Sequence, residues 1–298
     1  MRRMLSYDRM LLLLLCTPGI LHFIVFKYTP LLGNVIAFQE YNLFQGLRNS
    51  PWVGLQHFQN MLDYPEFARI MGNTLLLSLY SIVFGFPAPL FLALLLNEMR
   101  SLLLKRTTQT LLYLPHFLSW IIVGGIVINF LSIDGSINQI VSWFGVQPQD
   151  WLIHSEYFRS ILVSVGIWKE VGWGMIIYFA ALTGINPHLY EAAMVDGAGR
   201  WRRMWSITIP SLMPAIVVLF LLRVGVVLDS NVEQVLVLLN PFVRDTGEVI
   251  DTYVYRIGLL GSQYSFTTAI GLFKSVIGLA MVMMLNQISK KATGESIY

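Results

Sequence analysis

Residues 186–228 read NPHLYEAAMVDGAGRWRRMWSITIPSLMPAIVVLFLLRVGVVL and join a polar, arginine-rich segment to a long apolar one. The apolar part, 211–228, carries Arg223 as its only ionic side chain before the outer end. A helix needs about 20 mostly apolar residues to cross the hydrocarbon core of a bilayer. The stretch therefore predicts a membrane-spanning helix that follows a short segment exposed to water.

Five further stretches meet the same criterion of length and hydrophobicity. The six predicted spans cover about 11–38, 74–96, 110–131, 161–185, 211–228 and 266–288. Hydrophobicity does not alternate with a period of two, so a helical bundle is favoured over a membrane barrel. We expect an all-α, polytopic membrane protein in which residues 1–298 form a single transmembrane domain.

The first stretch also has features of a signal peptide, because Arg2, Arg3 and Arg9 precede the apolar run Leu11–Leu15. A bulky Leu15 stands before Cys16, where a lipoprotein cleavage site needs a small residue. The apolar character continues past Pro18 to Phe38, which is long enough for a span. We therefore predict an uncleaved first helix.

The composition excludes several classes of protein. Of the 298 residues, 55% are hydrophobic and 12% are charged, against roughly 25% charged in soluble domains. This excludes a soluble enzyme and a disordered chain, and a net charge of +3 without a basic stripe predicts no binding of nucleic acid. The single Cys16 excludes a disulfide framework, and the five histidines are scattered, so we predict no metal site.

The distribution of Lys and Arg predicts the orientation in the membrane. Segments 1–10, 97–109, 186–210 and 289–298 together carry 11 of these side chains. The segments on the other side, 39–73, 132–160 and 229–265, carry 5. Because positive residues are enriched in cytoplasmic loops, we expect both termini and the 186–210 loop in the cytoplasm.

The loop 186–210 has the signals of a short, exposed helix. Asn186 is a plausible N-cap and Pro187 a plausible first helical residue, and Gly197 or Gly199 can end the helix. A helix of two to three turns is not stable alone in water. It must dock on another surface, and the small Ala192 and Ala193 permit a close approach.

The spacing of Glu191-Ala192-Ala193, Gly197, Ile207 and Ile209-Pro210 resembles the EAA signature of the permeases of ABC importers. The family has leucine where this chain has Ile209, a mild departure. The resemblance implies that this helix sits in a groove of a cytoplasmic ATPase. The implied coupling residues are Glu191, Ala192, Ala193, Asp196 and Gly197. An ordinary amphipathic, positively charged loop is the alternative.

Nearly the whole chain resembles the sugar-specific branch of these permeases. The matching pieces are Phe26–Leu31, Trp52–Leu55, Asn73-Thr74, Leu114-Pro115, Glu233–Val235, Asn240-Pro241 and Asp251–Arg256. They are similar to the subgroup that imports oligosaccharides and polysaccharide fragments, alginate importers in particular. The resemblance implies a type I importer permease with a MetI-like core in the bacterial cytoplasmic (inner) membrane. The implied substrate is an alginate or other uronate oligosaccharide.

The resemblance also implies partners. They are a second homologous permease, which we expect to be a different polypeptide chain, two cytoplasmic ATPases and an extracytoplasmic solute-binding protein. The chain has no glycine-rich phosphate loop, so ATP and Mg²⁺ are expected on the ATPases, and no cofactor is expected here. We therefore expect a pathway and coupling subunit and not an enzyme.

Polar groups inside the spans are the candidates for the substrate pathway, because they are costly there. Amides and carboxylates can bind sugar hydroxyls, and tryptophans can stack on sugar rings. The candidates are Asn231, Glu233, Gln234, Tyr253, Trp120, Trp173, Lys169 and Arg223. Each also has a structural interpretation, such as a Lys169–Glu170 ion pair or hydrogen bonds between helices.

Two other functions remain open at this point. An ion-gradient-driven secondary sugar transporter would show internal repeats and ion ligands within the membrane, and we find no convincing repeat. An intramembrane enzyme would need a catalytic constellation in the bilayer, and none stands out.

Overall fold

The structure is a computed structural model that describes residues 2–293; residues 1 and 294–298 of the expected cytoplasmic termini lie outside the described part. The chain divides into two compact units, 1–64 with 254–273 and 65–253 with 274–298. Described residues form helices and no strand apart from an isolated bridge between Gln39 and Trp52. This confirms the all-α prediction.

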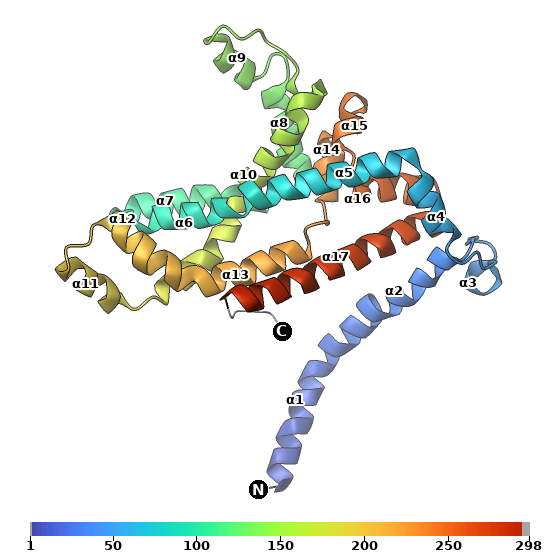
Figure 1. Cartoon of the computed structure of the whole chain (residues 1–298), viewed down its shortest axis with the longest axis horizontal. Helices are drawn as coiled ribbons and strands as arrows, with labels where there is room; N and C mark the ends of the chain where they lie inside the picture. The colour runs from blue at the N-terminus through green and yellow to red at the C-terminus, as the bar shows by residue number, and fades with distance from the viewer. Residues whose placement is uncertain (1, 294–298) are drawn as a thin grey trace. The chain divides into compact units, whose positions relative to one another are not determined.

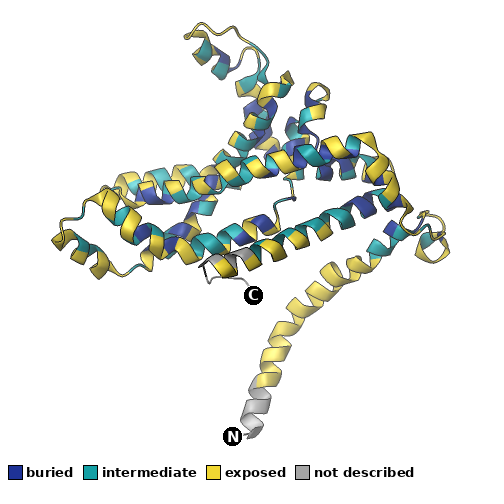
Figure 2. Ribbon diagram, in the orientation of Figure 1, coloured by how far each residue is buried: buried dark blue, intermediate teal, exposed yellow. Residues whose placement is uncertain are grey.

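The first unit contains the N-terminal helix and a small folded segment after it. Its elements are α1 (Arg2–Phe23), η1 (Ile24–Tyr28), α2 (Thr29–Leu32), η2 (Gly33–Phe38), α3 (Gly46–Asn49), α4 (Gln56–Asp63), η8 (Val254–Leu260) and the start of α17 (Tyr264–Thr293). Residues 9–32, which run through α1, η1 and α2, are all exposed (Figure 2). Such a surface requires lipid or protein around it.

The second unit holds most of the helices. Its elements up to the 186–210 loop are α5 (Pro65–Tyr80), η3 (Ser81–Gly85), α6 (Pro87–Asn97), α7 (Leu102–Tyr113), η4 (Leu114–Phe117), α8 (Trp120–Leu131), α9 (Ser136–Ser142), η5 (Trp151–Ile153) and α10 (Ser155–Thr183). The remaining elements are α11 (Pro187–Val195), α12 (Arg200–Arg203), η6 (Met204–Thr208), α13 (Ile209–Gly225), α14 (Val232–Leu238), η7 (Pro241–Val243), α15 (Arg244–Gly247), α16 (Ile250–Tyr253) and the rest of α17.

Six helices in the described residues are long and apolar enough to cross a membrane, as predicted. They cover Arg9–Phe38, Pro65–Asn97, Trp120–Ser142, Ser155–Thr183, Arg200–Gly225 and Tyr264–Gln287. The expected third span, 110–131, contains a break, because α7 ends at Tyr113 and α8 begins at Trp120. Pro115 lies in the intervening turn, and the Ser119 hydroxyl caps α8 by accepting a hydrogen bond from the Ile122 amide.

Three of the long helices contain a π-helical turn that ends two residues before a proline. The turns η1, η3 and η6 end at Tyr28, Gly85 and Thr208, and prolines follow at 30, 87 and 210. A proline inside a helix lacks an amide donor, and its ring clashes with the carbonyl four residues before it. The wider turn relieves that clash, so α5, η3 and α6 run on as one helix (Figure 1).

The helices of the second unit pack around α10. This helix packs against α6 and α7 at glycines, which have no side chain. A Cβ at Gly172 would collide with the Leu112 carbonyl, and one at Gly174 would press on Pro89. Small residues of this kind let membrane helices approach closely. Two buried clusters result: one contains Val123, Phe158 and Leu238, and the other contains Met175 and Leu212.

Candidate functional site

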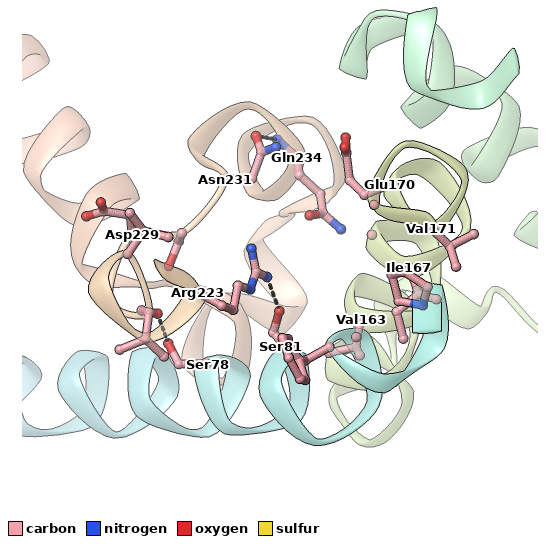
Figure 3. Close-up of a pocket in the computed structure, with 18 of the residues that line it drawn as sticks. Ser78, Ser81, Val163, Ile167, Glu170, Val171, Arg223, Asp229, Asn231 and Gln234 are labelled. Atoms are coloured by element: carbon pink, nitrogen blue, oxygen red, sulfur yellow. Dashed lines mark hydrogen bonds between the residues drawn. The ribbon is translucent and has the colours of Figure 1, made fainter. Parts of the chain in front are cut away.

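A cavity of about 580 Å³ lies within the second unit (Figure 3). Its walls come from α5, η3, α6, the start of α8, α10, the end of α13 and the start of α14. Residues of both buried clusters line it, so the cavity lies between the two parts of the core. A volume of this order can hold a small-molecule ligand.

Five of the eight predicted pathway residues line this cavity. They are Trp120, Trp173, Arg223, Asn231 and Gln234. Lys169, Glu233 and Tyr253 are not part of its wall. Lys169 and Tyr253 are buried and Glu233 is exposed, on the same short helix as Gln234. Most of the predicted residues therefore share one cavity, but the sequence does not resolve which face of each helix meets it.

The amides of Asn231 and Gln234 are positioned by the start of α14. Asn231 caps this helix, because its Oδ1 accepts a hydrogen bond from the Gln234 backbone amide at 3.2 Å. The Gln234 Nε2 donates to the Leu162 carbonyl of α10 at 2.6 Å. One polar atom of each side chain is thus used in a hydrogen bond within the protein. The other amide atoms, Asn231 Nδ2 and Gln234 Oε1, are of the kind that binds sugar hydroxyls.

The buried Lys169 side chain supports the wall from behind. Its Nζ donates to the His116 carbonyl at 2.8 Å and lies 3.6 Å from a Glu170 carboxylate oxygen. The same ammonium lies 5.3 Å from the centre of the Trp120 ring. A buried lysine needs partners of this kind to remain charged. Lys169 therefore holds Glu170, His116 and Trp120 in place.

The two tryptophans differ in what they can offer a ligand. Trp120 is 6% exposed, so its ring contributes to the core as well as to the wall. Trp173 is 49% exposed, and the His116 ring stacks on it with 4.6 Å between centroids and an interplanar angle of 4°. His116 covers one face of Trp173, and its Nδ1 is 2.9 Å from Glu170 Oε2.

Arg223 extends from the last turn of α13 toward the middle of the cavity (Figure 3). Its guanidinium donates to the Ser81 hydroxyl at 2.5 Å. Ser81 opens the π-helical turn η3, and its carbonyl accepts the Phe86 amide at 3.1 Å. The irregular turn thus places a hydroxyl within the membrane-spanning helix where Arg223 can reach it. Such turns often occur at functional sites.

The wall contains further polar residues that are not among the eight predicted pathway residues, namely Ser78, Ser81, Glu170, Asp229 and Ser230. The two serines lie in an apolar span, where a single hydroxyl gives no distinctive signal. Ser78 donates to the Val227 carbonyl at 2.5 Å, a contact between residues far apart in the chain. Glu170 could have been identified from the sequence, because a charged residue next to Lys169 within a span is costly.

A compact ion cluster lies beside the cavity at Asp229. Lys274 of α17 places its Nζ 2.7 Å from Asp229 Oδ1 and 2.5 Å from Asp251 Oδ1. The other Asp251 oxygen accepts the Ser230 amide at 2.8 Å. The cluster connects α17, α16 and the segment after α13.

The predicted coupling helix is present as α11, and its caps are those expected. Asn186 Oδ1 accepts the His188 amide at 3.0 Å, and Pro187 is the first helical residue. At the other end, Gly197 has a φ of +75°, and the amide of Ala198 donates to the carbonyl of Ala193 at 2.8 Å. This is a Schellman arrangement, which suits glycine because it has no Cβ.

Most of α11 is exposed in the described structure: none of its residues is buried, and only Tyr190 and Ala193 are half-buried. Glu191 is exposed and its Oε2 lies 2.9 Å from His188 Nδ1. Val195 is 89% exposed. One contact ties the helix to the membrane-spanning part: the Tyr190 hydroxyl lies 3.0 Å from the Thr208 hydroxyl of η6. In residues 2–293 no group of three or more His, Cys, Asp or Glu side chains could hold a metal ion.

Comparisons with known proteins agree with this architecture. The family model "binding-protein-dependent transport system inner membrane component" matches residues 85–294. The polygalacturonan/rhamnogalacturonan transport system permease protein YteP of Bacillus subtilis (strain 168) is 46% identical over 96% of this chain and 90% of its own. Protein LplB of the same strain is 44% identical over 99% of this chain and 92% of its own.

A solved structure has the same fold over the whole chain. It is a bacterial alginate ABC transporter in complex with an alginate pentasaccharide-bound periplasmic protein, with a TM-score of 0.90 at 40% identity over 99% of both chains. These findings agree with the EAA resemblance and not with an ion-driven transporter or an intramembrane enzyme. The chain therefore belongs to the inner membrane components of binding-protein-dependent transport systems, and it is a multi-pass ABC transporter permease with a MetI-like fold.

Proposed function

We propose that this chain is a permease subunit of an ATP-driven importer that carries oligosaccharides, and uronate oligosaccharides in particular, into the cytoplasm. The observation that supports this most is the likeness over the whole chain to a permease of the alginate transporter. The 46% identical relative is named for transport of polygalacturonan and rhamnogalacturonan, which are also acidic polysaccharides. The cavity adds amides, hydroxyls and an arginine at membrane depth.

The helix α11 would couple ATP hydrolysis by the ATPases to import. Seven of its nine residues are exposed and both of its ends are capped, so it presents a preformed surface. We assign the contact with an ATPase to Glu191, Ala192, Ala193, Asp196 and Gly197. ATP and Mg²⁺ would be bound by two such ATPases, and their closure would move α11 as a rigid body.

The motion has a direct path to the cavity. Tyr190 of α11 contacts Thr208 of η6, and η6 continues into α13, whose last turn carries Arg223. A displacement of α11 would therefore shift α13 and alter the wall of the cavity. The full transporter would contain a second, homologous permease and an extracytoplasmic binding protein in the bacterial inner membrane.

Uptake by cells that lack this gene tests the proposed function. We expect deletion to abolish import of labelled oligogalacturonates or alginate oligosaccharides, and the gene supplied in trans to restore it. A tag on this chain should also co-isolate an ATPase. Normal uptake of every acidic and neutral oligosaccharide in the deletion strain would overturn the substrate class. Isolation of the chain without any ATPase would overturn the coupling.

Cysteine labelling tests the orientation, with Cys16→Ala as the background because Cys16 is the only cysteine. We expect a membrane-impermeant maleimide to label Gln147→Cys and Asp245→Cys in intact spheroplasts. Ser101→Cys and Gly199→Cys should react only after the membrane is opened. All four positions are exposed, so protection reports the side of the membrane and not burial. Labelling of Ser101→Cys in sealed cells would reverse the orientation drawn from the charges.

A further inference from the structure

The charged side chains in the wall of the cavity are Glu170, Arg223 and Asp229. Counted without their neighbours, two carboxylates and one guanidinium suit a neutral or cationic ligand. Their contacts lead to a different result, because a charge already paired with another contributes little to the field in the cavity. The field in the cavity therefore depends on which of these three charges has no oppositely charged partner.

Both carboxylates are engaged by neighbouring groups. Glu170 is 2.9 Å from His116 Nδ1 and 3.6 Å from the Lys169 ammonium. Asp229 is 2.7 Å from the Lys274 ammonium, which it shares with Asp251 at 2.5 Å, and the second Asp251 oxygen accepts the Ser230 amide. Figure 3 shows the Glu170 carboxylate directed away from the guanidinium of Arg223.

Arg223 is the cation that remains. Its partner is the neutral Ser81 hydroxyl, and among the described residues it makes no ion pair with a carboxylate. The side chain is exposed to the cavity and belongs to a membrane-spanning helix, where an unpaired charge is costly. Ser81 binds one side of the guanidinium and leaves the other donors available. A guanidinium carries five N–H donors in a plane that matches a carboxylate.

We infer that Arg223 is the carboxylate-binding residue of the cavity and forms a paired hydrogen bond with successive uronate groups of a passing oligosaccharide. This rests on the proposed function and adds the contact that distinguishes acidic from neutral sugars. Asn231 and Gln234, which lie above Arg223 in Figure 3, contact the sugar hydroxyls. Lys169 and Lys274 act indirectly, because their ammonium groups pair with the carboxylates of the wall that would otherwise repel the substrate.

Binding of sugars to the isolated transporter complex tests this inference. The binding protein is removed, so its own selectivity does not affect the result. The complex is isolated through a tag on this chain, freed of binding protein and placed in lipid nanodiscs. Fluorescence anisotropy then measures the Kd for labelled trigalacturonate and for its methyl ester. We expect Arg223→Gln to weaken binding of trigalacturonate by about tenfold or more and binding of the ester by less than about twofold, since one charge-assisted contact is lost.

Two matched variants complete this experiment. Arg223→Lys keeps the charge and should retain binding within about threefold of wild type, although it loses the paired geometry. Arg48→Gln makes the same change in net charge at an exposed site outside the cavity and should leave both Kd values unchanged. An equal loss for acid and ester in Arg223→Gln would make Arg223 structural. Unchanged binding of the acid, or no binding of either sugar by wild type, would overturn the inference as well.

A charge-compensation test addresses the role of Lys274. We expect Lys274→Met to weaken binding of trigalacturonate by about threefold or more, because Asp229 then faces the ligand unpaired. Adding Asp229→Asn to Lys274→Met should restore most of the affinity. A double variant no better than the single one would show that Lys274 acts by holding the helices. Import lost in the deletion strain, together with wild-type binding by Arg223→Gln, would leave the proposed function standing and refute this inference alone.

Discussion

Gly197→Val should abolish most transport while the protein still inserts into the membrane. Gly197 has a φ of +75°, a conformation that costs a β-branched residue roughly 1–3 kcal/mol. The hydrogen bonds that end α11 depend on it, from the amides of Gly197 and Ala198 to the carbonyls of Met194 and Ala193. A helix of nine residues has little stability to lose. We expect import and co-isolation of the ATPase to fall at least about tenfold.

Gly199→Val is the matched control for this variant. Gly199 lies two residues away in the same exposed segment, but its φ of −67° and ψ of 169° are extended and accommodate valine. A Cβ at either glycine would meet open space, so only the backbone conformation differs between the two sites. Gly197→Asn should retain partial function, because asparagine tolerates positive φ. Wild-type import by Gly197→Val would contradict a coupling role for α11.

The local features of this protein could be predicted from its sequence. The six spans follow from the length of each apolar run, and the ends of α11 follow from Asn186, Pro187 and Gly197. These signals act within a few residues of where they stand. For the same reason the break between α7 and α8 was missed, since hydrophobicity continues through Leu114–Leu118 although the backbone turns there.

The arrangement of the cavity depends on contacts that local patterns do not encode. Arg223 and Ser81 meet across 142 positions of sequence, and their contact requires the π-helical turn at Ser81. Glu233 and Gln234 are adjacent in the chain, but only Gln234 reaches the cavity because successive helical residues point about 100° apart. Lys169 carries a charge that could bind a ligand, but it is buried and is not part of the wall of this cavity. The role of each candidate in transport stays a prediction.

A second large effect is expected at Asn73, in the contact between α5 and the segment 244–250. Asn73 is 2% exposed, and its Nδ2 donates to the carbonyls of Asp245 at 2.9 Å and Glu248 at 3.1 Å. Its Oδ1 accepts from the guanidinium of Arg159 at 2.7 Å. The neighbouring Thr74 hydroxyl accepts the Ile250 amide at 3.0 Å. One amide side chain thus satisfies two backbone carbonyls and an arginine.

Asn73→Leu keeps the volume of this side chain and removes all three hydrogen bonds, so it should lower the free energy of unfolding by about 3–5 kcal/mol. The cost exceeds that of the bonds themselves because the carbonyls and the Arg159 charge remain in place without Asn73. Thermal unfolding of the purified protein in detergent measures the loss. Asn60→Leu makes the same substitution at an exposed helical position and should change the midpoint little.

The Arg159→Met variant separates this network from a general effect of polarity. Arg159 also donates through Nε to the Thr246 carbonyl at 3.1 Å, so its loss should destabilise the same segment. Because Asn73 and Arg159 share a hydrogen bond, the double variant should lose less than the sum of the two single variants. Additive losses would mean that the residues act independently. A midpoint for Asn73→Leu equal to that for Asn60→Leu would show that residues 244–250 are held to α5 by apolar packing and not by this network.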